Sequence, residues 1–279
     1  MTAARVLFST GSLYLLDTAR CFELAAEAGF DGIEIMCDER FSTRDPHYLQ
    51  RLSETFQLPV LVAHTPFSQR VAGWQDTSQI GLIKHTLQLA EQLDAESIVV
   101  HLPLWLSQGQ LRAGSWSLPF PWQSAFHSVK DWITHDLPEL QSRTPVKIAL
   151  ENMPTKKLLG REFNPAWWNS VAEWSQVHTH LTLDTTHWAT HQIDPLAAYQ
   201  AARGQVAHVH LSNFDGREHR LPHKGYLDLA AFLRALAADH FNGTISLEVH
   251  PDALDFYKAD LILRNLHDSL HFCRQHLTT

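Results

Sequence analysis

Cysteine is scarce in this chain of 279 residues, which contains only Cys21, Cys37 and Cys273. Three widely separated cysteines cannot build a disulfide framework or a CxxC metal knuckle. The N-terminal segment lacks the charged start, apolar centre and cleavage site of a signal peptide. No run approaches the roughly 18 apolar residues that cross a bilayer. We therefore expect a protein of the reducing cytoplasm that does not associate with membranes.

Positive charge and phosphate-binding motifs are also lacking. Lys and Arg number 22 against 30 Asp and Glu, giving a net charge of −8. Nucleic-acid binding usually needs a basic surface, so this balance argues against DNA or RNA as a partner. No GxGxxG follows the first expected strand, and GxxxxGK[ST] is absent, which disfavours an open doubly wound sheet, the alternative fold. The residue in excess is histidine, with 19 copies.

Short β-branched apolar runs alternate with segments of helical period along the whole chain. The helical period is visible in the apolar stripe of Ile80, Ile83, Leu87 and Ala90. The expected strands are 5–10, 32–36, 59–64, 97–102, 146–152, 181–184, 206–212 and 244–250. Eight such units without a linker predict an α/β protein, a single (β/α)8 barrel domain over residues 1–279.

One long stretch, 103–123, shows no regular pattern and is rich in Trp, Pro and Gly. Its rings Trp105, Trp116, Phe120 and Trp122 favour a cover over the barrel, because disordered loops seldom carry so many aromatics. Packing of these rings on the outer helices is the open alternative.

Metal-competent side chains stand at the carboxyl ends of six expected strands, where barrel enzymes carry their chemistry. They are His64, His101, Glu151, Asp184 with His187 just beyond it, His210 and Glu248. Each alone would be read as a structural histidine or a helix cap. Together, four histidines and three carboxylates need charge compensation, which a divalent cation supplies at once. Imidazole and carboxylate without thiolate suit Zn²⁺, Mn²⁺, Fe²⁺ or Co²⁺.

The set divides into two groups. One ion could be enclosed by Glu151, Asp184, His210 and Glu248. His64 and His101 could reach a second ion, with Glu151 as the bridge. His208 and His250 lie two residues from ligands on the same strands, as supporting partners of the ligands or as inward core residues.

Seven segments carry a resemblance to a known family. They are "GFDGIEI", "VLVAHTPF", "IVVHLP", "IALENMP", "LTLDTTH", "VHLSNFDG" and "ISLEVHP". In this order and spacing they resemble the xylose isomerase-like barrel superfamily, which holds sugar isomerases and epimerases together with endonuclease IV, of AP endonuclease family 2. The likeness covers nearly the whole chain.

In the epimerase branch, the resemblance implies one Mn²⁺ or similar ion held by the residues matching Glu151, Asp184, His210 and Glu248. The two glutamates lie on opposite sides of the substrate there, so that one removes a proton and the other returns it beside a metal-held enediolate. The residue matching His187 orients substrate hydroxyls. This chain departs from the pattern because Lys156 and Lys157 occupy the neighbourhood of an acidic residue that follows "EN" in those enzymes.

His64 and His101 are extra to that scheme and match the endonuclease IV branch, which uses three Zn²⁺ ions. Its third site would need His187 plus an Asp and a His after the seventh strand. Glu218 and Arg220 stand at those positions here, and Glu218, His219 or His223 could substitute. The third site is therefore incomplete by sequence.

These residues support three hypotheses. The preferred one is an isomerase or epimerase that abstracts a proton next to the carbonyl of a sugar, sugar phosphate or related polyol. The second is a di- or trinuclear zinc hydrolase with a bridging water as nucleophile and a phosphodiester or other small substrate, DNA being disfavoured. The third is a barrel that binds a ligand without catalysis. One to three Mn²⁺, Zn²⁺ or Co²⁺ ions per chain are expected.

For catalysis we expect Glu151, Glu248 and His187. Substrate contacts are expected from His187, Arg217, Trp105 and Trp188, because aromatic faces stack on sugar rings and a cation can hold an anionic group. The expected partner is a small-molecule substrate, and a homo-oligomer is left open.

Overall fold

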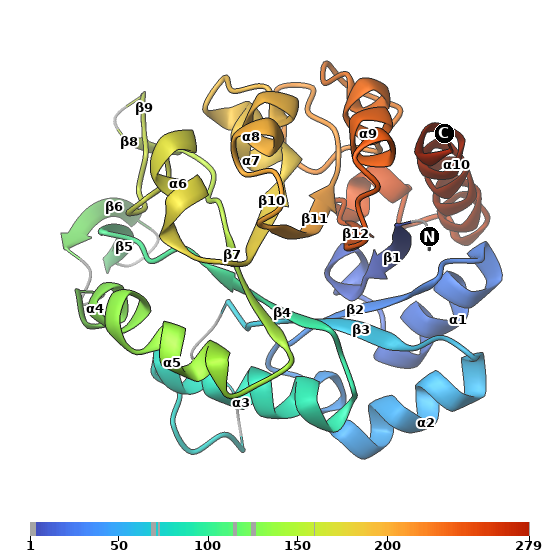
Figure 1. Cartoon of the computed structure of the whole chain (residues 1–279), viewed down its shortest axis with the longest axis horizontal. Helices are drawn as coiled ribbons and strands as arrows, with labels where there is room; N and C mark the ends of the chain where they lie inside the picture. Colours follow the sequence, from blue (N-terminus) through green and yellow to red (C-terminus); the bar gives the residue numbers. More distant parts are fainter. Residues whose placement is uncertain are drawn as a thin grey trace.

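The computed structural model describes residues 4–67, 71, 73–113, 116–123, 127–158 and 160–278, with the backbone alone at 106–113, 116–123, 127 and 259. Eight parallel strands close into a barrel in the order β1-β12-β11-β10-β7-β4-β3-β2, with helices around the outside (Figure 1). The strands are β1 Arg5–Ser9, β2 Gly32–Met36, β3 Val60–His64, β4 Ser97–His101, β7 Lys147–Glu151, β10 Leu181–Asp184, β11 Val206–Leu211 and β12 Thr244–Leu247. The predicted α/β barrel is confirmed, each strand lying within its expected range.

Helices follow the strands as the apolar periodicity predicts. They are α1 Thr18–Ala28, α2 Pro46–Phe56, α3 Gln79–Gln92, α4 His127–His135, α5 Leu137–Ser142, α6 Val171–Val177, α7 Thr185–Thr190, α8 Pro195–Ala201, α9 Leu229–Ala238 and α10 Ala259–Leu277. Short 3₁₀ turns occur at η1 Thr10–Leu13, η2 Phe41–Thr43 and η3 Pro251–Leu254. Helix α10 lies beside α1 and closes the ring (Figure 1). Among the described helices, none is long and apolar enough to span a membrane.

Strand register places the predicted site residues at one level of the rim. His101 of β4 stands opposite Glu151 of β7, and Asp184 of β10 stands opposite His210 of β11. Because side chains alternate along a strand, these residues share the inward face of the barrel. Register alone therefore brings neighbouring strand ends together as one site.

The barrel interior beneath this rim is unusually polar for a buried space. A small apolar cluster contains Leu7, Leu61, Val62 and Val99. The larger core, which includes the outward residues Phe8 and Ile33, fills the space between strands and helices. By contrast, the inner layer also carries fully or almost fully buried polar side chains, namely Ser9, Glu34, Thr182, His208, Thr244 and Ser246. Such groups need hydrogen-bond partners inside the barrel.

The stretch 103–123, expected to be irregular, contains an antiparallel hairpin of β5 Leu106–Ala113 and β6 Trp116–Gln123. Pro119 and Pro121 obscure the strand pattern, since proline is disfavoured inside sheets. A two-stranded ribbon tolerates them because both of its strands are edges. The predicted cover over the barrel rests on Trp116, Phe120 and Trp122, whose side chains lie outside the described ones.

A second hairpin, β8 Lys156–Leu158 with β9 Arg161–Phe163, follows β7. The two hairpins stand on the same side of the barrel (Figure 1). Their bases are joined by backbone hydrogen bonds from Trp105 N to Pro165 O at 2.9 Å and from Trp167 N to Pro103 O at 3.0 Å. The loops after β4 and β7 thus form one continuous wall. The three cysteines are buried and unpaired, as expected.

Candidate metal centre

His210 of β11 is the centre of the predicted ligand set. Its Nδ1 lies 2.8 Å from Glu151 Oε1, 2.9 Å from Glu248 Oε2 and 3.9 Å from Asp184 Oδ2. These four residues each offer one ligand atom within 4.8 Å of all the others. Strand β12 ends at Leu247, so Glu248 reaches the site from the first position of the following loop. The structure therefore brings together the four residues proposed for one ion.

His64 and His101 approach the same glutamate from its other side. Their Nε2 atoms lie 3.4 Å and 3.2 Å from Glu151 Oε2. The imidazole of His64 donates from Nδ1 to the carbonyl of Thr65 at 2.7 Å. In a neutral ring this leaves a lone pair on Nε2, the atom that faces Glu151. Glu151 thus stands between His210 on one side and the pair His64 and His101 on the other.

Burial and mutual attraction set the charges in this cluster. Burial alone would lower the pKa of His210, but the carboxylates of Glu248, Glu34 and Glu151 raise it well above its usual value. Burial alone would raise the pKa of Glu151, but the charge of His210 and the close approach of His101 and His210 hold it well below its usual range. Three carboxylates are therefore ionised around one imidazole, and the cluster attracts a cation.

Unpartnered buried atoms show that a metal ion fits this site. Within the described chain, His64 Nε2, Glu151 Oε2 and Asp184 Oδ2 are buried and have no hydrogen-bond partner. Buried polar atoms are nearly always satisfied, so the orphaned oxygens of Glu151 and Asp184 indicate a missing cation, and the orphaned nitrogen of His64 is a further donor atom beside Glu151. The set offers nitrogen and oxygen without sulfur, which suits Zn²⁺, Mn²⁺, Fe²⁺ or Co²⁺.

Asp184 serves two partners with its two oxygens. Oδ1 caps helix α7 by accepting from His187 N at 2.8 Å and from the Thr186 hydroxyl at 3.0 Å. Oδ2 remains free and faces His210 and His187. The helix begins directly after the strand because Asp184, the last residue of β10, is also the N-cap of α7. This is why a carboxylate and an imidazole follow the strand at a spacing of three.

His187 and His219 form a neighbouring group with Asp184. Their ring centroids lie 5.6 Å apart, and the three residues offer ligand atoms within 4.8 Å of one another. Of the proposed substitutes at the incomplete third site, His219 and Glu218 lie at the cavity. His223 packs towards Phe272 of α10, with ring centroids 6.4 Å apart.

The loop that carries His219 is organised by Asn213. The Asn213 side chain donates to the carbonyls of Pro222 and Leu227 at 2.8 Å and 3.2 Å. Its carbonyl oxygen accepts from the backbone N–H groups of Phe214 and Leu227. A Cβ at Gly225, where φ is +157°, would stand 2.2 Å from this side chain. Glycine is required there so that the loop can close upon Asn213.

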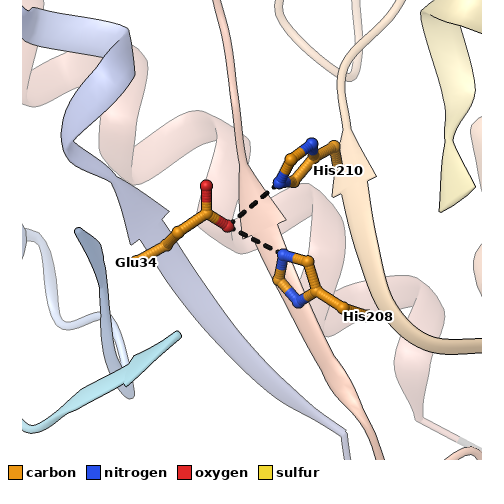
Figure 2. Close-up of side chains that lie close together, drawn as sticks. All are labelled: Glu34, His208 and His210. Carbon is orange, nitrogen blue, oxygen red and sulfur yellow. Dashed lines mark hydrogen bonds and ion pairs between the residues drawn. The ribbon is translucent and has the colours of Figure 1, made fainter. Parts of the chain in front are cut away.

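A buried carboxylate that the sequence reasoning missed lies beneath the centre. Glu34 of β2 accepts hydrogen bonds at one oxygen from Nε2 of His208 at 2.7 Å and from Nε2 of His210 at 3.1 Å (Figure 2). A charged residue inside the otherwise apolar strand "GIEIM" was the available signal. His208 is thus a supporting partner of the site. His250, by contrast, is exposed and caps η3 through Asp252 N.

A cavity of about 420 Å³ opens above the cluster. His64, His101, Glu151, His187 and Glu248 contribute to its wall. Its remaining lining is largely apolar and comes from the loops after β3, β4 and β7 and from the first turns of α3. The predicted ligands therefore border a space that can hold a small molecule.

Two predicted substrate contacts lie elsewhere. The ring of Trp188 is 0% exposed and packs edge-on against Trp174 in the core, with centroids 5.4 Å apart, so it does not line the described cavity. Trp188 comes shortly after a strand end, but helix α7 starts there and turns the ring toward Trp174. Arg217 pairs with Asp215 at 2.8 Å, is 71% exposed and has no place in the described cavity lining. Trp105 is 39% exposed and packs edge-on against Phe163 beside the cavity.

Fold and site define a closed (β/α)8 barrel whose rim gathers histidines and carboxylates able to hold a metal ion. A family model described as a xylose isomerase-like TIM barrel matches residues 22–270. The chain belongs to this family, as its sequence segments indicate.

Among relatives, Uncharacterized protein ML2432 of Mycobacterium leprae (strain TN) is 28% identical over 305 residues, covering 98% of both chains. Uncharacterized protein Rv0498 of Mycobacterium tuberculosis (strain H37Rv) is 28% identical over 299 residues, covering 99% of this chain and 98% of its own.

Similar solved structures include epimerases and an AP endonuclease. A D-psicose 3-epimerase with D-tagatose from Clostridium cellulolyticum H10 has a TM-score of 0.70 at 14% identity, covering 99% of this chain and 100% of its own. A 3-keto-D-glucoside 4-epimerase from E. coli has a TM-score of 0.67 at 19% identity, covering 98% and 99%. An AP endonuclease, family 2, from Brucella melitensis has a TM-score of 0.63 at 16% identity, covering 92% and 98%. At these identities the likeness shows the fold.

The two roles of Asp184 can be separated by substitution. Mn²⁺ at about 100 times its Kd should stabilise the metal-stripped wild type by about 2.7 kcal/mol in urea unfolding. Asp184→Asn should keep its metal-free stability, because Asn is as good an N-cap as Asp, yet lose most of this gain. Asp184→Ala should also lose about 1 kcal/mol without metal. A full metal response in Asp184→Asn would remove Asp184 from the ligand set.

Proposed function

We propose that this protein is a divalent-metal-dependent isomerase or epimerase that acts on a sugar, sugar phosphate or related polyol by proton abstraction next to a carbonyl. One observation carries the proposal. Glu151 at the end of β7 and Glu248 directly after β12 both lie within 3 Å of His210 Nδ1, and both line the cavity. Two carboxylates at one candidate metal site, bordering a substrate-sized space, meet the need for removing a proton and returning it.

A bound cation supplies Lewis-acid stabilisation of the negative charge that develops on the substrate oxygens. The protein residues supply the proton transfers. His210 and the neighbouring histidines lower the pKa of Glu151, so this carboxylate is ionised at neutral pH. Burial would raise the pKa of Glu248, but His210 lowers it, so it too is ionised. Each is therefore available as a general base. In an isomerisation the carboxylate that takes the proton returns it to the neighbouring carbon, whereas in an epimerisation the other carboxylate must carry a proton, taken from solvent, and deliver it from the opposite face.

His187 is suited to orienting a substrate hydroxyl. Its Nδ1 donates to the carbonyl of Asn152 at 2.7 Å, which fixes the ring. In the neutral form Nε2 is then an acceptor. His187 also lines the cavity, so a substrate hydroxyl can donate to this nitrogen.

The names of similar structures support this class of reaction. The psicose, allulose, tagatose-like, ribulose and 3-keto-glucoside epimerases are named for reactions on sugars. They share the whole barrel with this chain, so their chemistry is a reasonable model for the proposed one. The particular sugar is left to experiment.

Lys156 favours a substrate with an anionic group. It is the only Lys or Arg among the described residues that line the cavity, and its side chain is exposed at the opening. The neighbouring Lys157 instead pairs with Glu162 at 3.3 Å. The metal end of the cavity carries the carboxylates, so a ligand charge would be held at the Lys156 end. A sugar phosphate or sugar acid fits this arrangement.

A second candidate function is a dinuclear hydrolase. The observation that favours it is the approach of His64 and His101 to Glu151 Oε2, with His64 Nε2 unpartnered. These residues could hold a second ion that shares Glu151. We rank it second for two reasons. The chain is acidic, and the group of Asp184 and His187 gains only His219 where the endonuclease pattern has an Asp and a His.

Glu151→Gln should abolish proton exchange. In D₂O, a panel of ketoses and ketose phosphates should gain deuterium at the carbon next to the carbonyl with wild-type protein, as followed by NMR. Removing the carboxylate should slow exchange by about 10²–10⁴-fold. Glu54→Gln, on the exposed face of α2, is the matched control and should exchange normally. Undiminished exchange in Glu151→Gln would exclude Glu151 as the base.

Metal content separates the two candidate functions. Protein purified without chelators should contain one tightly bound divalent ion per chain by elemental analysis. His64→Ala and His101→Ala should leave that count unchanged if the isomerase proposal holds. Two or three ions that are depleted by both substitutions would favour the hydrolase and contradict the isomerase.

Lys156→Ala should weaken the binding of anionic substrates and leave the binding of neutral ones unchanged. An exposed charge-assisted contact contributes about 1.5 kcal/mol, so KM for a phosphorylated substrate should rise about 10-fold while kcat stays unchanged. KM for the corresponding neutral sugar should not change. Lys157→Ala is the matched control. An equal effect on neutral and phosphorylated substrates would contradict an anion contact at Lys156.

A further inference from the structure

Glu34 is a fully buried carboxylate at the centre of the barrel. Strand β2 lies three strands from β11 in the barrel order, so Glu34 reaches its partners across the interior. Figure 2 shows one of its oxygens between the two imidazoles of β11. The other oxygen accepts from the Ser9 hydroxyl at 3.1 Å. All polar contacts of this carboxylate are thus directed at Ser9, His208 and His210.

These contacts determine where the protons of both imidazoles sit. An ionised carboxylate only accepts hydrogen bonds, so each histidine must present an N–H from Nε2 to Glu34. In neutral His208, Nδ1 is then an acceptor, and the Thr244 hydroxyl lies 2.7 Å away to donate to it. In neutral His210, Nδ1 is left with a lone pair. That atom is the one facing Glu151, Glu248 and Asp184.

The group around Glu34 is not a second ion site. Glu34, His208 and His210 could by proximity hold a metal. However, Glu34 and His208 have no buried unpartnered side-chain atom in the described structure, whereas Glu151 and Asp184 each have one. Glu248, Glu151 and His187 line the cavity, but Glu34 and His208 do not. An ion therefore has unsatisfied ligands and an entry path only above His210.

We propose that Glu34 is a positioning residue for the metal centre, which fixes His210 with Nδ1 toward the ion while His208, held by Thr244, braces the carboxylate from below. This inference rests on the metal site of the proposed function but not on the reaction. Metal-bound histidines commonly donate their second N–H to a carboxylate, which fixes the tautomer and makes the ligand nitrogen more basic. Here one carboxylate spans the barrel to do this.

A merely structural role explains Glu34 poorly. A buried ionised group is costly to desolvate, and apolar residues of similar volume are often equally stable or better at such a position. The neighbouring interior residues Leu7, Val62 and Val99 show that this barrel can fill its interior with aliphatic side chains. The hydrogen bond that Glu34 accepts from His210 Nε2 accounts for a carboxylate at this level of the barrel.

The test compares metal affinity in Glu34→Gln and wild type. Gln keeps the size of the side chain but loses the charge, so that at most a neutral amide oxygen accepts from both imidazoles. Zn²⁺ binding to chelator-stripped protein, measured by competition with a chromophoric chelator, should weaken about 10–100-fold. High Zn²⁺ should restore full occupancy. Glu54→Gln, on the exposed face of α2, is the matched control, because it makes the same chemical change away from the site, and its affinity should equal that of wild type.

A second measurement does not depend on the variant folding. In Zn²⁺-loaded wild type, ¹⁵N NMR of His210 should show a protonated Nε2 and an unprotonated Nδ1. Unchanged Zn²⁺ affinity in Glu34→Gln, or a protonated Nδ1 in wild type, would overturn the role of Glu34 while leaving the metal centre intact. Wild-type protein that does not bind Zn²⁺ or Mn²⁺ at all would overturn the centre itself, and this inference with it.

Discussion

The attraction between His210 and the carboxylates that surround it is the interaction on which the rest of the site depends. Three glutamates from different strands or strand ends contact the imidazole of His210. They are Glu151, Glu248 and Glu34. Such a concentration of buried charge is tolerable only because the groups compensate one another. The closed barrel makes it possible, since its strands bring residues distant in sequence to a single axis.

Much of this could be predicted from the sequence. The eight strands were visible because parallel strands buried on both faces are continuous apolar runs. His64, His101, Glu151, Asp184 and His210 were visible because each closes such a run. Their convergence then followed from a general property of the fold, that carboxyl ends of barrel strands meet at one rim.

The features that could not be predicted depend on packing across the barrel. Glu34 lies inside a strand, and its partner His208 is 174 positions away in sequence. His219 takes its place through a loop closed on Asn213 and Gly225, which no strand pattern reveals. Trp188 follows the candidate ligand Asp184 in sequence, but its ring turns into the core because α7 begins at Thr185, directly after its N-cap Asp184. In each case the local sequence pattern does not determine the direction in which the side chain points.

The position of Glu34 has a consequence for how this barrel can diversify. Many residues that line the cavity sit on loops above the rim, whereas Glu34 and Thr244 lie on strands inside the barrel, away from the cavity lining. Changes in the loops can alter what is recognised without disturbing the electronic character of the ligand nitrogen. Changes at Glu34 or Thr244 would alter the support of His210 and leave the residues that line the cavity unchanged. The residues that line the cavity and the residues that support His210 thus lie on physically separate parts of one chain.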